Sequence, residues 1–400
     1  MSGGAPVAEE ILSNQAGRRV LPGDIVVCEP DLILGTDGSV PMALDYFEAM
    51  GGESVAHPDR VLFARDHYAP ATTASTRGFH QRMQDFADLH GVEILTVGEG
   101  ISFLHALEHG RVRPGDLVVG GDSHTVTCGV AGALGVGIGS SDLAGALLTS
   151  RVWLRVPETR RIELTGALPT GVLGKDVALE LARRTGGRVG PFVCLEFHGD
   201  GVPTLPEEEK TVVANMAAEM GAMAGIFPQG IQSSPVAPDD TVDMSALEPM
   251  IALPPRPDHA VTVRDVLGRP VDWVFLGTCA GGRLNDFREA ARVLQAGGGL
   301  ARGVTLVVSP PTARIRRALE EDGTLSAFER WGAVISETGC GPCCGTSGPL
   351  PPPNARVIST ANRNFSARMG DATVDILLAS SATCAAAATR GCVVDPREIA

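Results

Sequence analysis

Residues 115–125 read GDLVVGGDSHT, a short apolar run that ends in a group of polar side chains. The same pattern occurs in RVLFARDH at residues 60–67 and in VDWVFLGTCAGG at residues 271–282. Between such runs lie stretches of helical periodicity, for example TRGFHQRMQDFADLHG at residues 76–91. Apolar strands that alternate with helices are typical of α/β proteins, whose sites lie beyond the carboxyl ends of the strands. We therefore predict an α/β fold with its functional residues directly after the strands.

The composition is that of a large globular chain without polyanionic partners. Of its 400 residues 44% are hydrophobic, which is enough apolar surface for two or three packed domains. The formal net charge of −14 repels nucleic acid and anionic membranes, so we expect neither as a partner. The first residues contain no secretion signal, and no run reaches the roughly 18 apolar residues of a membrane span. We predict a cytoplasmic protein.

We expect three successive α/β units, which cover residues 1–160, 161–256 and 257–400. Residues 229–259 are rich in Pro, Ser and Asp, which indicates a linker at the end of the second unit. The glycines of residues 135–139 superficially suggest a dinucleotide-binding loop. No strand pattern directly precedes them, so we interpret this segment as close packing of a helix.

Three of the nine cysteines are candidate metal ligands. Cys340 and Cys343 lie two residues apart in TGCGPCCG, and Cys279 follows another predicted strand. Three cysteines cannot complete a structural zinc site, but they can hold three corners of an iron–sulfur cube and leave its fourth iron open. A redox pair or ordinary buried thiols are the alternatives. We interpret the remaining six cysteines as ordinary thiols, and we expect Cys344 to point away from the centre: Cys28, Cys128, Cys194, Cys344, Cys384 and Cys392.

Two pairs of a carboxylate and an imidazole follow predicted strands, in Asp66-His67 and in Asp122-Ser123-His124. A carboxylate that orients one ring nitrogen raises the basicity of the other, which suits proton delivery to a departing hydroxyl. A buried, hydrogen-bonded histidine with no catalytic role is the common alternative for each pair taken alone.

Arg363 and Arg368 are candidates for binding substrate carboxylates, because a guanidinium matches a carboxylate in bidentate fashion. They follow the predicted strand ARVIST in a loop, and Arg283 is a third candidate. Glu219 lies four residues after Asn215 on a predicted helix and therefore on the same face. A solvated surface position is the alternative for Glu219.

Several of these motifs together resemble those of the aconitase family. They are Gly-Thr-Cys at 277–279 with Arg283, Gly-Cys-Gly-Pro-Cys at 339–343, Gly-Asp-Ser-His-Thr at 121–125, and Asn-Arg-Asn-Phe-Ser-Ala-Arg at 362–368. The resemblance extends through nearly the whole chain. In length and ending, the chain is similar to the large subunits of isopropylmalate dehydratase and homoaconitase, which lack the mobile swivel domain of one-chain aconitases.

The resemblance implies a three-domain α/β/α architecture without the swivel domain and a hydro-lyase activity. The substrate would be a small hydroxylated di- or tricarboxylate such as 3-isopropylmalate or homocitrate. Cys279, Cys340 and Cys343 would ligate a [4Fe–4S] cluster, and a separate small subunit would complete the site and supply the base. The implied catalytic residues are Asp66, His67, Asp122, Ser123, His124 and Glu219. The implied substrate-binding residues are Arg283, Arg363, Arg368, Asn215 and Asn362.

Three positions depart from the family pattern. Ser102-Phe103 stands where a Cys or Ser and then His is usual, Ala280-Gly281 replaces Thr-Asn, and Thr36 precedes Asp37 where relatives often carry His or Asn. Two explanations remain open: a hydro-lyase refitted to an unusual substrate, or a binding or regulatory module that has lost catalysis. Retention of the three cysteines, both arginines and both histidine pairs favours the hydro-lyase.

Overall fold

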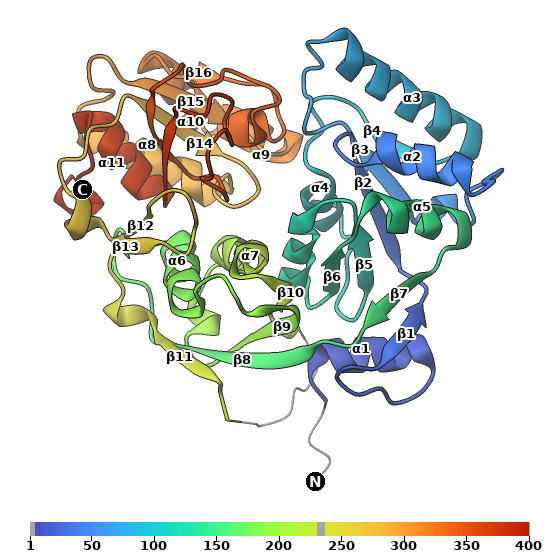
Figure 1. The fold of residues 1–400 in the computed structure, drawn as a ribbon. Coiled ribbons are helices and arrows are strands. Elements are labelled where there is room, and N and C mark those ends of the chain that lie inside the picture. The colour runs from blue at the N-terminus through green and yellow to red at the C-terminus, as the bar shows by residue number, and fades with distance from the viewer. Residues whose placement is uncertain (1–4, 230–236, 400) are drawn as a thin grey trace.

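The computed structural model describes residues 5–229 and 237–399. Two lobes stand side by side above a third unit that joins them (Figure 1). One lobe carries the helices and strands of the N-terminal part, and the other carries those of the C-terminal part. Across these residues, none of the helices combines the length and the apolar character that crossing a membrane requires.

The N-terminal lobe is built on a five-stranded sheet in which all neighbouring strands are parallel. In spatial order its strands are β4 (Glu93–Leu95), β3 (Val61–Ala64), β2 (Leu32–Thr36), β5 (Leu117–Gly120) and β6 (Leu134–Gly137). Its helices are α2 (Val40–Ala49), α3 (Ala74–His90), α4 (Ser102–Glu108) and α5 (Ser140–Thr149). Strand β5 is buried along its whole length, as expected for a parallel strand covered on both faces.

The joining unit contains a second parallel sheet, in the order β10 (Ala222–Ile226), β9 (Gly190–His198), β8 (Glu158–Thr165) and β11 (Asp240–Asp243). Helices α6 (Gly174–Thr185) and α7 (Glu207–Met216) pack above it (Figure 1). At the base of the N-terminal lobe, helix α1 (Val7–Ala16) lies beside an antiparallel pair formed by β1 (Ile25–Cys28) and β7 (Val152–Arg155).

The C-terminal lobe contains a seven-stranded sheet whose second strand runs antiparallel to both of its neighbours, while all other neighbouring strands are parallel. In spatial order its strands are β13 (Ala260–Thr262), β12 (Met250–Ala252), β18 (Asp375–Ala379), β17 (Arg356–Ser359), β14 (Trp273–Gly277), β15 (Thr305–Ser309) and β16 (Val334–Ile335). Its helices are α8 (Leu284–Ala296), α9 (Ala313–Glu321), α10 (Thr324–Arg330) and α11 (Ser381–Arg390). The alanine-rich α11 is almost entirely buried, because its small side chains let α8 approach closely.

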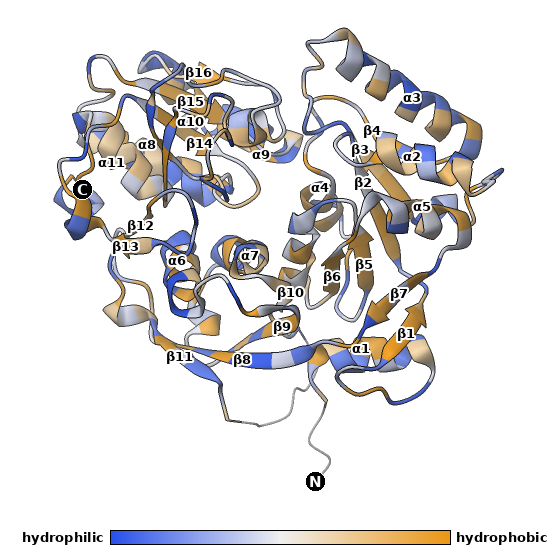
Figure 2. Cartoon of the chain, in the orientation of Figure 1, coloured by the Kyte–Doolittle hydropathy of each residue, from blue (hydrophilic) through white to orange (hydrophobic). Residues whose placement is uncertain are grey.

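The predicted α/β class is therefore confirmed, and Figure 2 shows the expected division between hydrophobic strands and more hydrophilic helix surfaces. The prediction of a linker at residues 229–259 is wrong for two segments, because β11 pairs with β8 and β12 pairs with β18. Residues 230–236 of that segment lie outside the described part of the chain. The domain boundaries remain a prediction.

The interpretation of residues 135–139 as helix packing is also wrong, because residues 134–137 form strand β6. The glycines there make room for the backbone of a 3-10 segment, Ser123–Ala131. A Cβ on Gly135 would lie 2.3 Å from the carbonyl oxygen of Thr125, and one on Gly137 would lie 2.9 Å from that of Asp122. Backbone contact with the Asp122 turn thus explains these glycines.

The same 3-10 segment joins the N-terminal lobe to the second sheet at a point where only glycine fits. A Cβ on Gly129 would lie 1.9 Å from the carbonyl oxygen of Gly225, and Phe227 donates its N–H to the carbonyl of Gly129 at 2.9 Å. Both partners are backbone, so no side chain can rotate to relieve the clash.

We predict that Gly129→Ala lowers the free energy of unfolding by about 2 kcal/mol or more, because the added methyl group overpacks a rigid contact. Gly78→Ala is the matched control, since Gly78 lies inside α3 with nothing near its ideal Cβ. This control should stabilise the protein by about 0.5 to 1 kcal/mol. Urea denaturation of both variants measures the two effects, and equal effects would contradict the packing described for Gly129.

Candidate active site

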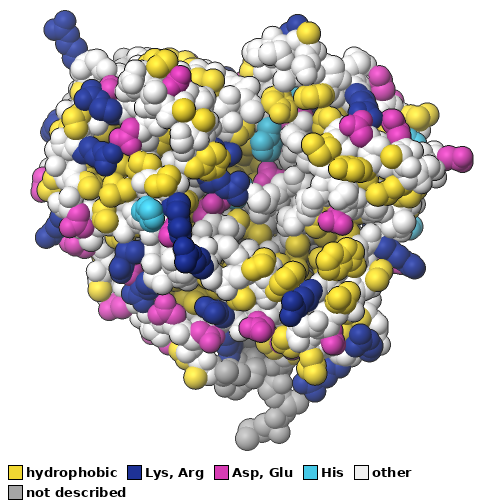
Figure 3. Space-filling model, in the orientation of Figure 1, with side chains coloured by type: hydrophobic (Ala, Val, Ile, Leu, Met, Phe, Trp, Pro, Cys, Tyr) yellow, Lys and Arg dark blue, Asp and Glu magenta, His cyan; other side chains and the backbone are white. Residues whose placement is uncertain are grey.

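The candidate residues lie directly after parallel strands of the two lobes. Asp66 and His67 follow β3, Asp122 follows β5, and Cys279 follows β14. The face between the lobes is hollowed, and histidine and basic side chains gather in this hollow (Figure 3). Because the carboxyl ends of both sheets point toward this region, their loops meet there, as is usual for open α/β sheets.

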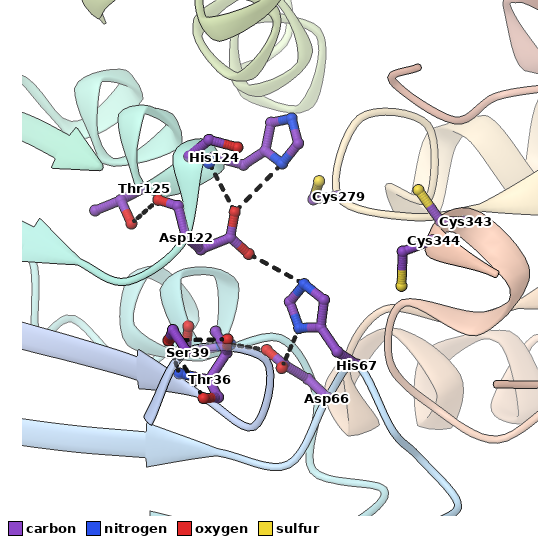
Figure 4. Close-up of polar contacts among 12 residues, drawn as sticks. Thr36, Ser39, Asp66, His67, Asp122, His124, Thr125, Cys279, Cys343 and Cys344 are labelled. Carbon is purple, nitrogen blue, oxygen red and sulfur yellow. Dashed lines mark hydrogen bonds and ion pairs between the residues drawn. The ribbon is translucent and has the colours of Figure 1, made fainter. Parts of the chain in front are cut away.

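His67 is held by carboxylates on both sides of its ring. Its Nδ1 lies 2.7 Å from Asp66 Oδ1, and its Nε2 lies 3.5 Å from Asp122 Oδ2 (Figure 4). Its backbone N–H donates to Asp37 Oδ1 at 2.9 Å. Burial alone would lower the pKa of His67, but the charges of Cys340 and Asp66 outweigh it and raise this pKa well above its usual value. The ring is thus positioned and charged as a proton donor.

A second chain of contacts starts at His124. Its Nδ1 lies 3.4 Å from Asp122 Oδ1, and its Nε2 lies 3.0 Å from Glu219 Oε1. Arg363 donates through Nε to Glu219 at 2.9 Å and through Nη2 to Ser123 Oγ at 2.9 Å. The predicted residues Asp122, Ser123, His124, Glu219 and Arg363 are therefore in one connected network. Glu219 lies on the 3-10 helix Ala217–Met220, which directly follows the end of α7. It is therefore not on the same α-helix as Asn215, which is where the sequence predicts it.

This network favours the charged forms of its members. Burial by itself would raise the pKa of Glu219, but the hydrogen bond and charge of His124 and the charge of Arg363 lower it to about 2. Burial likewise opposes ionisation of Asp122, yet the hydrogen bond from His124 and the neighbouring imidazoles hold its pKa well below the usual range. The pKa of His124 is raised by Asp122 and Glu219, although burial opposes this shift.

Cys279, Cys340 and Cys343 line one narrow cavity together with His67, Asp122 and His124. Figure 4 shows Cys279 and Cys343 beside these polar side chains. In the described part of the chain, three ligand atoms lie within 4.8 Å of one another only at Asp37, Asp66 and His67, which are already hydrogen-bonded. The three sulfurs are thus spread more widely than around one zinc ion, where neighbouring sulfurs are about 3.8 Å apart.

The donor set of this cavity fits an iron–sulfur cluster better than a single ion. Three thiols from two loops face one space, and Arg368 Nη2 lies 3.7 Å from Cys343 Sγ as a donor to that sulfur. The cavity itself is only about 20 Å³, room for roughly one water. A bound cluster therefore requires the thiol side chains, or the glycine-flanked loop of Cys340 and Cys343, to move outward.

Asn215 and Asn362, expected to bind substrate, are fully buried behind Cys279. Asn362 donates to Asn215 Oδ1 at 2.5 Å, and its Oδ1 lies 3.6 Å from Cys279 Sγ. Asn215 in turn donates to Thr127 Oγ1 at 2.8 Å. This arrangement orients the Cys279 thiol; Asn362 also lines the cavity, whereas Asn215 lies behind it and does not.

Cys344 also lines the cavity, but its Sγ points away from those of Cys279 and Cys343 (Figure 4), as expected, and lies 2.8 Å from Thr346 Oγ1. Phe103, one of the departures from the family pattern, is buried and closes another side of the cavity. The departure at Gly281 has a packing cause, since a Cβ there would lie 2.4 Å from Cβ of Thr360. The structure gives no specific reason for Ala280.

Arg283 lies apart from the other candidates. It borders a second cavity, formed with residues of α4, α7 and α9, and is not among the side chains around the three cysteines. Its position near Cys279 in sequence therefore does not bring its guanidinium into the same space.

Two residues near the site, Asp37 and Lys175, were missed by sequence reasoning. Asp37 is buried and accepts hydrogen bonds from the backbone of His67 and Tyr68, and His80 Nε2 lies 2.8 Å from its Oδ2. Lys175 is buried, and its Nζ donates to the carbonyl of Ala361 at 2.8 Å, next to the Asn362 loop. Asp37 follows strand β2, so its strand-end position was the available signal; nothing in the local sequence of Lys175 indicated burial.

The model of the aconitase family (aconitate hydratase) matches residues 9–232 and 264–391 of the chain. The chain is 38% identical to 3-isopropylmalate dehydratase large subunit 1 of Methanopyrus kandleri, over 98% of this chain and 99% of that protein. It is 37% identical to the homoaconitase large subunit of Thermus thermophilus, over 99% of this chain and 98% of that protein. The aconitase X structure of Thermococcus kodakaraensis has the same overall fold, with a TM-score of 0.55 at 12% identity, covering 92% of each chain.

We predict that Glu219→Gln is destabilising in a pH-dependent way. The pKa of Glu219 is lowered from 4.5 to about 2, so its ionised form contributes stability above about pH 4.5, and this contribution is lost as the pH falls toward 2. At about pH 6 the variant should be less stable by on the order of 3 kcal/mol.

Urea denaturation at a series of pH values measures this difference, which should shrink below about pH 4.5. Glu320→Gln is the control, since Glu320 forms an exposed pair with Arg316 and should change stability by less than about 0.5 kcal/mol. A Glu219→Gln penalty that stays constant with pH would show that the carboxylate charge is not its source.

Proposed function

Since this chain belongs to the aconitase family, we propose that it is the cluster-bearing large subunit of a hydro-lyase that removes water from a hydroxylated polycarboxylate and adds it back. The relatives are named as large subunits of 3-isopropylmalate dehydratase and of homoaconitase, so the proposed substrate is 3-isopropylmalate, homocitrate or a close analogue. The observation that carries the proposal is that the thiols of Cys279, Cys340 and Cys343 line one cavity together with two imidazoles and the Asp122 carboxylate.

Cys279, Cys340 and Cys343 are the proposed ligands of a [4Fe–4S] cluster. When bound, such a cluster with one open iron would act as a Lewis acid toward the substrate hydroxyl and carboxylate. Arg368, which reaches Cys343 Sγ, would stabilise the negative charge of the ligating thiolate. The Asn362 amide, which lies next to Cys279, would fix the direction of the Cys279 thiol.

The proposed proton donor to the leaving hydroxyl is His67. The ring forms a hydrogen bond with Asp66 through Nδ1, so its Nε2 points toward the cavity and Asp122. The charges around the ring keep it protonated, which is the form a general acid requires. His124 would keep Asp122 ionised and thereby hold this geometry in place.

The proposed substrate-binding groups are Arg363 and Arg368. Arg363 already spans Glu219 and Ser123 at the edge of a cavity of about 600 Å³ that opens beside the site. Its guanidinium therefore has a fixed orientation before substrate arrives, which reduces the entropy lost on binding a carboxylate.

A small subunit is the proposed partner, because the relatives carry the name large subunit. We propose that this partner is a swivel-domain protein that covers the hollow between the lobes and supplies the base for proton removal. On this proposal the isolated chain does not turn over substrate.

We predict that anaerobic reconstitution of the purified chain with iron and sulfide gives a brown protein that absorbs broadly at about 400 nm. Cys340→Ser should lose most of this absorbance and most of the bound iron, since it removes one of three ligands. Cys344→Ser should keep both, although Cys344 lines the same cavity, and Cys392→Ser is the control outside it.

Iron and sulfide analysis with electron paramagnetic resonance checks these outcomes. A colourless wild-type protein would exclude the cluster proposal and favour a binding module on the same scaffold. An equal loss in Cys344→Ser and Cys340→Ser would contradict the assignment of only three ligands.

We predict that Arg363→Lys, assayed with the small subunit, lowers kcat/KM by about 100-fold, mainly through a higher KM. A lysine ammonium cannot reproduce the two-pronged contact of a guanidinium with a carboxylate. Alkene absorbance with 3-isopropylmalate, homocitrate and citrate measures turnover. Arg356→Lys, on β17 and paired with Asp272, is the control and should behave like wild type; a wild-type KM in Arg363→Lys would exclude Arg363 from substrate binding.

A further inference from the structure

A second cavity, separate from the site of the cysteines, lies where helices α4, α7, α8 and α9 meet. Its volume is about 510 Å³, within the range of roughly 300 to 1,000 Å³ that small-molecule sites occupy in proteins. None of the proposed cluster ligands or catalytic residues lines it. We refer to it below as the helix-junction cavity.

Arg283 provides an unpaired cation in this cavity. Its side chain borders the helix-junction cavity although the residue is only 7% exposed. Its Nε and Nη2 are buried and have no hydrogen-bond partner among the described residues, although the carboxylates of Glu108, Asp286 and Glu208 act on it through their charges. A buried guanidinium without a partner costs free energy that a bound anion would recover.

Glu108 provides an unpaired acceptor in the same cavity. One carboxylate oxygen, Oε1, accepts from Thr312 Oγ1 at 2.9 Å, whereas Oε2 is buried and accepts no hydrogen bond from the described residues. Arg283 and Glu108 influence each other through their charges, yet they form no direct ion pair. The cavity thus offers a donor and an acceptor of opposite charge, held apart.

The remaining lining of the helix-junction cavity is mostly aliphatic, but it also includes Thr211 and the charged side chains of Glu207, Glu208 and Arg314. Leu104 and Leu107 from α4 face Ile315 and Ala318 from α9, and Val130 closes one side. A ligand that satisfies both charged groups and fills this space must carry an anionic group, a cationic donor and an aliphatic body.

We propose that the helix-junction cavity binds a small α-amino acid with an aliphatic side chain. The carboxylate accepts hydrogen bonds from Arg283, the ammonium group donates to Glu108, and the side chain packs against Leu104, Leu107 and Ile315. Arg283 is four residues from Cys279 at the start of α8, so occupancy of the cavity bears on the loop that carries a proposed cluster ligand. The proposal does not depend on the cluster or on the hydro-lyase activity.

Isothermal titration calorimetry of the purified chain tests the proposal with three probes of the same carbon skeleton. L-Leucine carries both charges, 4-methylpentanoate lacks the ammonium group, and 3-methylbutan-1-amine lacks the carboxylate. We expect L-leucine to bind at least about tenfold more tightly than either analogue, since each loses one charge-assisted contact. Absence of binding by L-leucine up to about 10 mM would overturn the proposal, and equal binding of 4-methylpentanoate would exclude the role of Glu108.

Two variants locate the binding site. Arg283→Met keeps the length of the side chain and removes the charge, and it should weaken L-leucine binding about tenfold or more. Ala318→Trp fills the cavity from a partly exposed position on α9 and should abolish binding without disturbing a buried group. Arg317→Met, on the same helix but outside the cavity, is the control and should bind as wild type does. Undiminished binding in Ala318→Trp would place the amino acid elsewhere and refute the proposal.

Discussion

A main-chain hydrogen bond from the N–H of Cys340 to the carbonyl of Asp66, at 2.9 Å, joins the two lobes at the candidate site. The hydroxyl of Ser347 adds a second link by donating to the carbonyl of His67 at 3.0 Å. These bonds hold the loop after β16 against the loop after β3. The first bond joins two backbone atoms and the second joins the Ser347 side chain to the backbone, and together they position Cys340 relative to His67. The proposed chemistry depends on this juxtaposition of thiol and imidazole.

The buried polar groups around this contact are connected by hydrogen bonds and ion pairs. Asp66 and Asp122 hold His67 from two sides, and His124 connects Asp122 to Glu219. Burial alone would neutralise these carboxylates, and the facing imidazoles and Arg363 keep Asp122 and Glu219 ionised. Such a network is costly to interrupt, because removal of one member leaves its buried partner without compensation.

The departures from the family pattern affect the walls of the cavity more than its polar network. Phe103 introduces an aromatic surface beside the cysteines, and Gly281 allows its loop to pack directly on Thr360. Phe103 makes the wall of the cavity less polar, whereas Gly281 is not among the residues that line it. A less polar wall would suit a substrate with an apolar substituent, in keeping with the refitted hydro-lyase that the sequence indicates.

Local periodicity and short motifs were enough to predict the α/β class, the strand-end positions of His67, Asp122 and Cys279, and the resemblance to the aconitase family. The folded chain was needed to find that Cys344 and Asn362 line the cavity, that Asn215 is buried beside Asn362, and that Arg283 borders a separate cavity. It also revealed the buried Asp37 and Lys175 and the strands within the expected linker. The direction of a side chain and the pairing of distant strands depend on contacts between segments far apart in sequence, which local patterns do not specify.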